Sequence, residues 1–109
     1  MSNPWIELCP GIRRRTLCHG RALYQMLAEL DAGSTMPAHS HFQEQITHVL
    51  RGRVVMILDG VRHELRAGDS LLIPSNVAHG AETIEQTLVI DTFSPRRNDY
   101  LAIDTAHGS

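Results

Sequence analysis

The amino-acid sequence predicts an all-β fold, a sandwich or barrel built as one domain. Short β-rich runs recur along the chain, and glycine, asparagine, aspartate or proline separates each run from the next. Asp59-Gly60 stands between two such runs and is a strong signal for a two-residue hairpin. No long helical pattern interrupts the runs, and a chain of 109 residues has the size of one domain. We therefore assign residues 1–109 to a single domain.

The first third of the chain contains one ambiguous element. Residues 1–11 are expected to form a lead-in, and residues 13–18 a short strand that ends near His19. Residues 21–31, RALYQMLAELD, are rich in amino acids that favour helix. This segment is short, has no good N-cap residue and lies between glycines, which leaves a strand open as the alternative.

The later elements follow from β-rich runs and the turns between them. Pro74 is expected to end a strand or occupy an edge, because proline cannot donate a ladder hydrogen bond. Ser94-Pro95 has the pattern of an N-cap followed by proline at the first helical position. We therefore expect a short helix over residues 95–101 and a frayed tail beyond it that includes His107. The strands expected before that helix cover residues 53–58, 61–66, 70–73, 79–83 and 87–93.

Two histidines near the middle of the chain carry the clearest chemical signal. One residue separates His39 from His41, and alternate residues of a β-strand point to the same face. Both imidazoles can therefore reach one metal ion, and Gln45 keeps the same parity and can add a carbonyl oxygen. Glu44 would take the place of Gln45 only if the strand slipped by one residue. A pair of exposed histidines on a half-buried strand would show the same spacing.

Two blocks of sequence together resemble the two motifs of the cupin family. The first block, GSTMPAHSHFQEQITHVLRG, covers residues 33–52 and contains both histidines. The second, GDSLLIPSNVAHGAET, covers residues 68–83 and contains a third histidine. The chain departs from the usual family pattern where Gln45 replaces glutamate, Asn76 replaces glycine and Thr83 replaces asparagine. The change at Asn76 is mild, because asparagine tolerates a positive φ.

The resemblance implies a fold and a metal site. The fold is a double-stranded β-helix, or jelly-roll β-barrel, followed by a short C-terminal helix. In that fold residues 21–31 form a strand, against their helix propensity. The implied cofactor is a divalent transition metal such as zinc, nickel, iron, manganese or copper, which imidazole and oxygen donors suit. The ligands that the resemblance implies are His39, His41, Gln45 and His79.

Asp91 lies in an otherwise apolar run, TLVIDTF. A carboxylate in a barrel interior must be paired, hydrogen-bonded or protonated. Strand parity allows Asp91 to share the metal side of the barrel, where burial raises its pKa and metal charge lowers it. Such a group can act as a general acid or base. A hydrogen-bonded structural aspartate fits the spacing equally well.

The segment DTFSPRRNDYL, residues 91–101, is similar to the end of small cupins that linearise unsaturated uronates in pectin and alginate breakdown. That resemblance implies that Asp91, Phe93 and Arg97 line the catalytic pocket and that the substrate is a small anionic molecule. By residue type alone Arg96 is an equal candidate, and Phe93 also fits a simple core role. The predicted function is a metal-dependent sugar-acid isomerase or lyase. A metal-dependent dioxygenase and a non-catalytic ligand-binding module stay open as alternatives.

Charge and composition limit the class of partner. The formal net charge is −2, and the basic run at residues 13–15 is expected to be a solvated strand edge, so we expect no nucleic-acid partner. No apolar run approaches the length of a membrane span and the chain start lacks a signal-peptide pattern, so we expect no membrane partner. We expect a cytoplasmic protein in which Cys9 and Cys18 are free thiols that act as small apolar filler.

Two further expectations concern surfaces. His48 is out of parity with the candidate ligands and should face away from the metal, and His63 lies in a turn region and should be exposed, so we expect neither to be a metal ligand. Ile46 and Leu50 point to the strand face opposite the candidate metal, which makes both faces of that strand apolar. A strand that is apolar on both faces needs cover on both. We therefore expect a homodimer.

Overall fold

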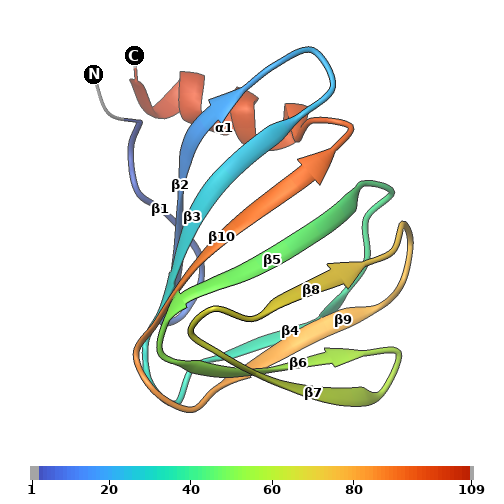
Figure 1. Cartoon of the computed structure of the whole chain (residues 1–109). Helices are drawn as coiled ribbons and strands as arrows, with labels where there is room; N and C mark the ends of the chain where they lie inside the picture. Colours follow the sequence, from blue (N-terminus) through green and yellow to red (C-terminus); the bar gives the residue numbers. More distant parts are fainter. Residues whose placement is uncertain (1–2, 109) are drawn as a thin grey trace.

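Two antiparallel sheets face each other and form a barrel that is open at one end (Figure 1). The computed structural model describes residues 3–108. One sheet has six strands in the order β1-β2-β3-β10-β5-β8, and the other has four in the order β4-β9-β6-β7. The strands are β1 Ile6–Cys9, β2 Ile12–His19, β3 Tyr24–Leu30, β4 Thr35–His39, β5 Glu44–Arg51, β6 Arg53–Leu58, β7 Val61–Arg66, β8 Ser70–Ile73, β9 His79–Thr83 and β10 Thr87–Ser94. The all-β prediction is confirmed, and one helix, α1 Asn98–Gly108, follows the last strand.

The ambiguous segment at residues 21–31 is a strand. Its ordered part, β3, pairs with β2 on one side and β10 on the other, so its backbone hydrogen bonds are satisfied in the sheet. Tyr24, Met26, Ala28 and Leu30 are buried, and the residues between them are partly exposed. This period of two decides the element, because burial of one face outweighs a helix propensity of a few tenths of a kcal/mol per residue.

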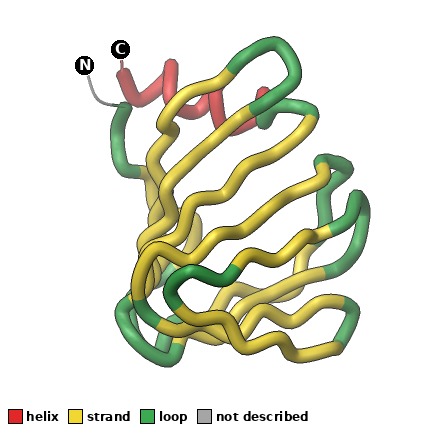
Figure 2. Tube along the Cα trace, viewed as in Figure 1, coloured by secondary structure: helices red, strands yellow, loops and turns green. Residues whose placement is uncertain are grey.

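The predicted hairpin between β6 and β7 is present. Leu58 pairs with Val61, which leaves Asp59 and Gly60 as the two turn residues. Both have positive φ, +47° and +81°, as the hairpin turn that suits the strand twist requires. The hairpin lies at the edge of the four-stranded sheet, at the bottom of the view in Figure 2.

The apolar core has two parts of different size. The larger part lies between the two sheets, and the smaller part packs Tyr24, Met26 and Phe93 against Tyr100 and Leu101 of α1. The helix therefore completes the second core and forms a wall at the open end of the barrel. The buried members of the larger core are Ile12, Ala28, Leu30, Val49, Val54, Met56, Leu65, Ile73, Ala81 and Val89.

The C-terminal helix differs from its prediction at both ends. The Ser94-Pro95 bond is a cis peptide bond at the end of β10, and the helix begins at Asn98 instead of residue 95. It continues to Gly108 and includes His107, so the expected frayed tail is helical over its described residues, while Ser109 lies outside them. Asp104 holds this end of the chain, because it forms a buried ion pair with Arg14.

Two surface expectations, for Arg14 and Cys18, need correction. Arg14 lies in the run expected to be solvated, yet its side chain is fully buried, because it alternates with Arg13 and Arg15 along β2. Cys18 is exposed instead of filling apolar space, whereas Cys9 packs partly buried against the main core. Both thiols are free, as expected. No helix in residues 3–108 is long and apolar enough to cross a membrane.

Candidate metal centre

Three histidines meet at the open end of the barrel, and each comes from a different piece of chain. His39 is the last residue of β4, His79 is the first residue of β9, and the two are partners in the sheet. His41 lies in the connection between β4 and β5. The possible ligand atoms of the three all lie within 4.8 Å of one another. The expectation that His39, His41 and Gln45 share one continuous strand is wrong, because the chain leaves the sheet after His39 and re-enters it at Glu44.

Each of these rings is held by a backbone carbonyl through Nδ1. The contacts are His39 to Pro37 O at 3.0 Å, His41 to Gln43 O at 3.0 Å and His79 to Val77 O at 2.9 Å. A carbonyl oxygen only accepts hydrogen bonds, so Nδ1 must carry the proton. In a neutral ring the lone pair is then on Nε2, which is the nitrogen left to bind a metal. A ring nitrogen held in this way is the usual support of a metal-ligating histidine.

Gln45 completes the donor set from the inner face of β5. Its Oε1 lies 3.1 Å from Nε2 of His41, and its Nε2 donates to Thr47 Oγ1 at 3.0 Å and Asp91 Oδ1 at 3.1 Å. These two donated bonds fix the amide so that its oxygen faces the histidines. A lone pair on Oε1 then faces a lone pair on His41 Nε2, an arrangement that a shared cation stabilises. The residues present therefore fit a divalent metal with three nitrogen donors and one oxygen donor.

The electrostatics of the pocket favour neutral imidazoles. Burial is the main cause that lowers the pKa of His79 to about 4, and electrostatic repulsion from His39, His41 and Arg97 contributes to the same shift. Burial also lowers the pKa of His41, with the charge of Arg97 as the next cause. A metal ligand must be unprotonated, so lowered pKa values keep these two rings ready to bind a metal at neutral pH.

Asp91 lies on the inner face of β10, as strand parity predicts. Its Oδ1 accepts hydrogen bonds from Thr47 Oγ1 at 2.6 Å and from Gln45. Its Oδ2 has no hydrogen-bond partner within residues 3–108 and remains available to a ligand. Burial raises the pKa of Asp91 to about 6, although both hydrogen bonds and the charge of Arg97 lower it. Asp91 therefore has a pKa suited to proton transfer near neutral pH.

The structure distinguishes between the two neighbouring arginines. Arg97 is 7% exposed and its guanidinium carbon lies 4.9 Å from the ring centre of Phe93. Arg96 instead turns away from the pocket and donates to Gly20 O at 3.3 Å and to Asn98 Oδ1 at 2.8 Å. Arg97 is therefore the one that lines the pocket, together with Phe93.

The remaining candidates lie outside the pocket. Glu44 is exposed and Gln45 is buried, so the strand has not slipped by one residue. His48 bonds to Ser70 Oγ at 2.7 Å on the outer face of the sheet. His63 is partly buried on β7, opposite Met56, and does not line the pocket. Both lie away from the histidine cluster, as expected, but His63 is partly buried within β7 and not exposed in a turn.

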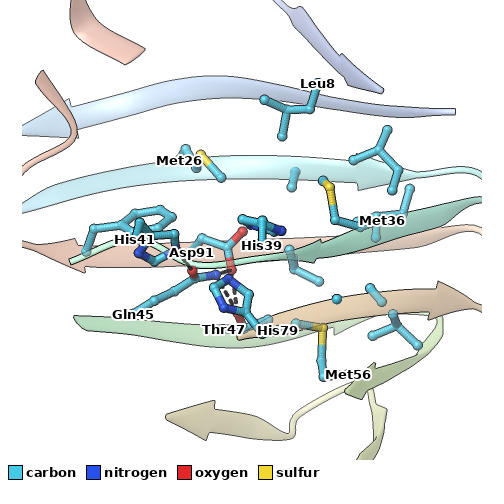
Figure 3. A pocket seen from close by; sticks show the side chains of 18 of the residues that line it. Leu8, Met26, Met36, His39, His41, Gln45, Thr47, Met56, His79 and Asp91 are labelled. Atoms are coloured by element: carbon cyan, nitrogen blue, oxygen red, sulfur yellow. Dashed lines mark hydrogen bonds between the residues drawn. The ribbon is translucent and has the colours of Figure 1, made fainter. Parts of the chain in front are cut away.

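Other pocket residues were not identified from the sequence. Figure 3 shows polar side chains, among them Thr47, gathered around Asp91, while Met36 and Met56 lie on the other side of the pocket. Tyr100 of α1 completes the wall near Arg97. Thr47 keeps the strand parity of Gln45, which was a usable signal, but Tyr100 reaches the pocket only through the docking of the helix. One side of the pocket is thus lined by polar donor groups and the other by apolar side chains.

This fold and its three-histidine centre define a cupin, and the comparisons agree. The chain belongs to the cupin family, whose domain description matches residues 26–92. It is 32% identical over 100 residues to the pectin degradation protein KdgF of Dickeya dadantii, covering 90% of this chain and 91% of that protein.

Solved structures give the same result. The structure of KdgF from a Halomonas species superimposes with a TM-score of 0.84 at 35% identity, covering 89% of this chain and 90% of the other. An RmlC-like cupin from Shewanella frigidimarina also has a TM-score of 0.84, at 33% identity, covering 90% of this chain and 88% of the other. The predicted barrel fold and family are therefore confirmed.

Proposed function

We propose that this protein is a metal-dependent enzyme of pectin or alginate breakdown that opens the ring of a 4,5-unsaturated uronate. One observation carries the proposal: a single pocket contains the histidine cluster, a carboxyl group with a raised pKa and a buried arginine. The similarity to KdgF over nine tenths of the chain supports the substrate class. The histidine cluster supports metal dependence.

The ligands of the metal in this proposal are His39, His41, Gln45 and His79. A divalent ion held by them would supply a Lewis acid that polarises a substrate oxygen. The amide of Gln45 is neutral, so these four ligands leave the full charge of the ion uncompensated. That net charge favours an anionic substrate.

The reaction is an isomerisation and needs no co-reactant. The bond between C1 and the ring oxygen breaks, and the anomeric hydroxyl loses a proton as C1 becomes an aldehyde. C4 gains a proton as C5 becomes a ketone. Asp91 transfers this proton through Oδ2, Arg97 binds the substrate carboxylate, and Phe93 excludes water from the wall beside them.

The metal ligands are tested by His41→Ala, with His48→Ala as the matched control. The first variant should lose stoichiometric metal, because it removes one of three imidazole donors. The control removes an imidazole that bonds Ser70 on the outer face and should keep its metal. Metal per subunit, measured by atomic emission after loading and desalting, decides the matter. Equal metal content in both variants would show that the assignment is wrong.

The roles of Asp91 and Arg97 are tested with a 4,5-unsaturated uronate. Asp91→Asn should keep fold and metal but lose turnover by about 10²- to 10⁴-fold, the usual contribution of general acid–base catalysis. Arg97→Lys should raise KM about tenfold, because a point charge replaces a bidentate fork. Arg96→Lys is the control and should leave KM unchanged. Full activity in Asp91→Asn would move proton transfer to another group.

The same assay separates the alternative functions. If protein loaded with each candidate metal leaves the uronate unchanged, the proposed reaction is wrong. Oxygen uptake with an organic acid would then indicate a dioxygenase. Tight binding of an acid without any product by NMR would instead indicate a ligand-binding module.

Two properties of the whole protein belong to this proposal. We place the protein in the cytoplasm, which the two free thiols support. We also propose that it is a homodimer, because large apolar side chains are exposed on the outer face of the six-stranded sheet.

A further inference from the structure

The ring of Tyr100 is contacted by two guanidinium groups. The guanidinium carbon of Arg97 lies 3.8 Å from the ring centre, and that of Arg14 lies 4.2 Å from it. Arg97 lines the pocket, whereas Arg14 comes from β2 and is buried behind the helix. Tyr100 therefore connects Arg97, which lines the pocket, to Arg14, which does not.

Arg14 fixes Tyr100 by two independent contacts. Besides stacking on the ring, its Nη2 donates to the backbone carbonyl of Tyr100 at 3.2 Å. Arg14 is itself held by Asp104, one turn further along α1, through Nη1 to Oδ1 at 2.8 Å. Asp104 Oδ2 also accepts a hydrogen bond from Thr16 Oγ1 at 2.5 Å. The first half of α1 is thus joined to β2 by a buried charged network.

A buried ion pair is an inefficient way to gain stability. Removing two charges from water costs several kcal/mol per ion, and apolar residues of similar volume often stabilise a fold as well or better. Arg14 is 0% exposed and its Nε has no hydrogen-bond partner in the described chain, so its desolvation is not fully compensated. What the pair does accomplish is to fix the position of Tyr100.

The orientation of the Arg97 guanidinium depends on the position of Tyr100. Its Nε and Nη2 donate to Asp99 at 3.1 and 3.0 Å, which occupies one edge of the fork. The rings of Tyr100 and Phe93 contact the guanidinium, and Nη1, on the other edge of the fork, does not bond to Asp99. The free edge is therefore the part of Arg97 left for a ligand.

We propose that Arg14, Asp104 and Tyr100 are positioning residues for substrate binding: together they hold the free edge of Arg97 where it receives the substrate carboxylate. This inference deepens the proposed function and rests on it for the role of Arg97. It makes α1 part of the binding site. None of the three residues takes part in proton transfer.

The test replaces the buried pair by apolar residues in the metal-loaded protein. Arg14→Met with Asp104→Leu removes both charges together, which avoids an unpaired buried ion. We expect kcat for the unsaturated uronate to stay within twofold and KM to rise about tenfold. The matched control is Arg62→Met with Glu82→Leu, an exposed ion pair on the other sheet, which should change neither value. Equal KM in the folded test variant and wild type would overturn the inference.

A binding measurement separates this inference from the proposed reaction. By calorimetry, metal-loaded wild type should bind D-galacturonate more tightly than D-galactose, which lacks the carboxylate. In the test variant, the ratio of the two dissociation constants should be about tenfold smaller. If wild type shows this preference and the test variant loses it, but wild type does not turn over the uronate, the proposed reaction is wrong and the inference still holds. No preference in wild type would overturn the inference. Tyr100→Leu, which leaves the ion pair intact, should lose the same preference and decides the matter if the double variant does not fold.

Discussion

Asp91 and His79 respond to pH in opposite directions. The pKa of Asp91 is raised from 3.8 to about 6, so between these values the folded protein binds more protons than the unfolded chain, and stability falls as pH rises. The pKa of His79 is lowered from 6.5 to about 4, so the unfolded chain binds more protons there, and stability rises with pH. The two effects oppose each other between about pH 4 and pH 6.

The substitution Asp91→Asn isolates the contribution of Asp91 to the pH dependence of stability. In metal-free protein at pH 8 we expect the variant to be more stable than wild type by up to about 3 kcal/mol, which corresponds to the rise of the Asp91 pKa from 3.8 to about 6. Near pH 4 the wild-type carboxyl is protonated and the difference should nearly vanish. The contribution of His79 is present in both proteins and cancels. Urea unfolding at the two pH values measures the difference, and an equal difference at both would contradict the pKa assigned to Asp91.

Residue types and spacing predicted part of the site, and cross-chain contacts supplied the rest. The motif spacing grouped His39, His41 and His79, which do lie together, although through three chain segments and not along one strand. Arg14 could not be predicted from its neighbours, because its partner Asp104 is 90 residues away in sequence. A local pattern reports which face a residue occupies, but not which distant side chain meets it there.

At the scale of elements, the turn between β5 and β6 is the most constrained. Gly52 has φ +95°, and a Cβ there would lie 2.3 Å from the carbonyl oxygen of Gln86 and 2.5 Å from Thr87 Oγ1. Gly60, in the β6–β7 hairpin, also has positive φ, but a Cβ there would meet nothing within 4 Å. A comparison of substitutions at these two glycines therefore distinguishes the cost of backbone strain from the cost of a steric clash.

We expect Gly52→Ala to destabilise the fold by at least about 2 kcal/mol more than Gly60→Ala. Both substitutions place alanine at a positive φ, which costs about 1 kcal/mol or more, but only the first also forces Cβ against the backbone. Thermal or urea unfolding of the two metal-free variants gives the comparison. An equal loss of unfolding free energy in the two variants would show that the backbone around Gln86 moves to accept the Cβ at little cost.

Elements with a strong local pattern were predicted well, and the helix boundary was not. The β6–β7 hairpin was predicted from Asp59-Gly60 alone. β3, in contrast, was expected to be a strand only from the family resemblance, against its helix-favouring composition. Ser94-Pro95 carries a helix-start pattern, but Ser94 ends β10, Pro95 lies in a bend, and α1 starts three residues after Pro95. The far end of α1 depends on the Arg14–Asp104 pair, so its length is set by tertiary contact and not by the sequence of the tail.

At the scale of the whole molecule, the six-stranded sheet has an apolar outer face. Ile46 and Leu72 are direct partners on β5 and β8 and are 47% and 50% exposed, and Leu50 on β5 is 42% exposed. Ile90 on β10, opposite His48, adds a further partly exposed apolar side chain. A sheet with apolar side chains on both faces favours a partner on the outer one. A second copy meets this need with the same patch, as in a two-fold dimer.

We expect the wild-type protein to be a dimer at micromolar concentration and Ile46→Glu with Leu72→Glu to be a monomer. Two buried carboxylates on each copy would have to be desolvated without a partner, which costs more than the apolar contact contributes. Ile103→Glu is the control, because Ile103 is 41% exposed but belongs to α1 and not to β5 or β8. Sedimentation equilibrium gives the masses, and metal content shows that the histidine cluster is intact in each variant. A monomeric wild type would refute the dimer, and a dimeric double variant would place its interface on another surface.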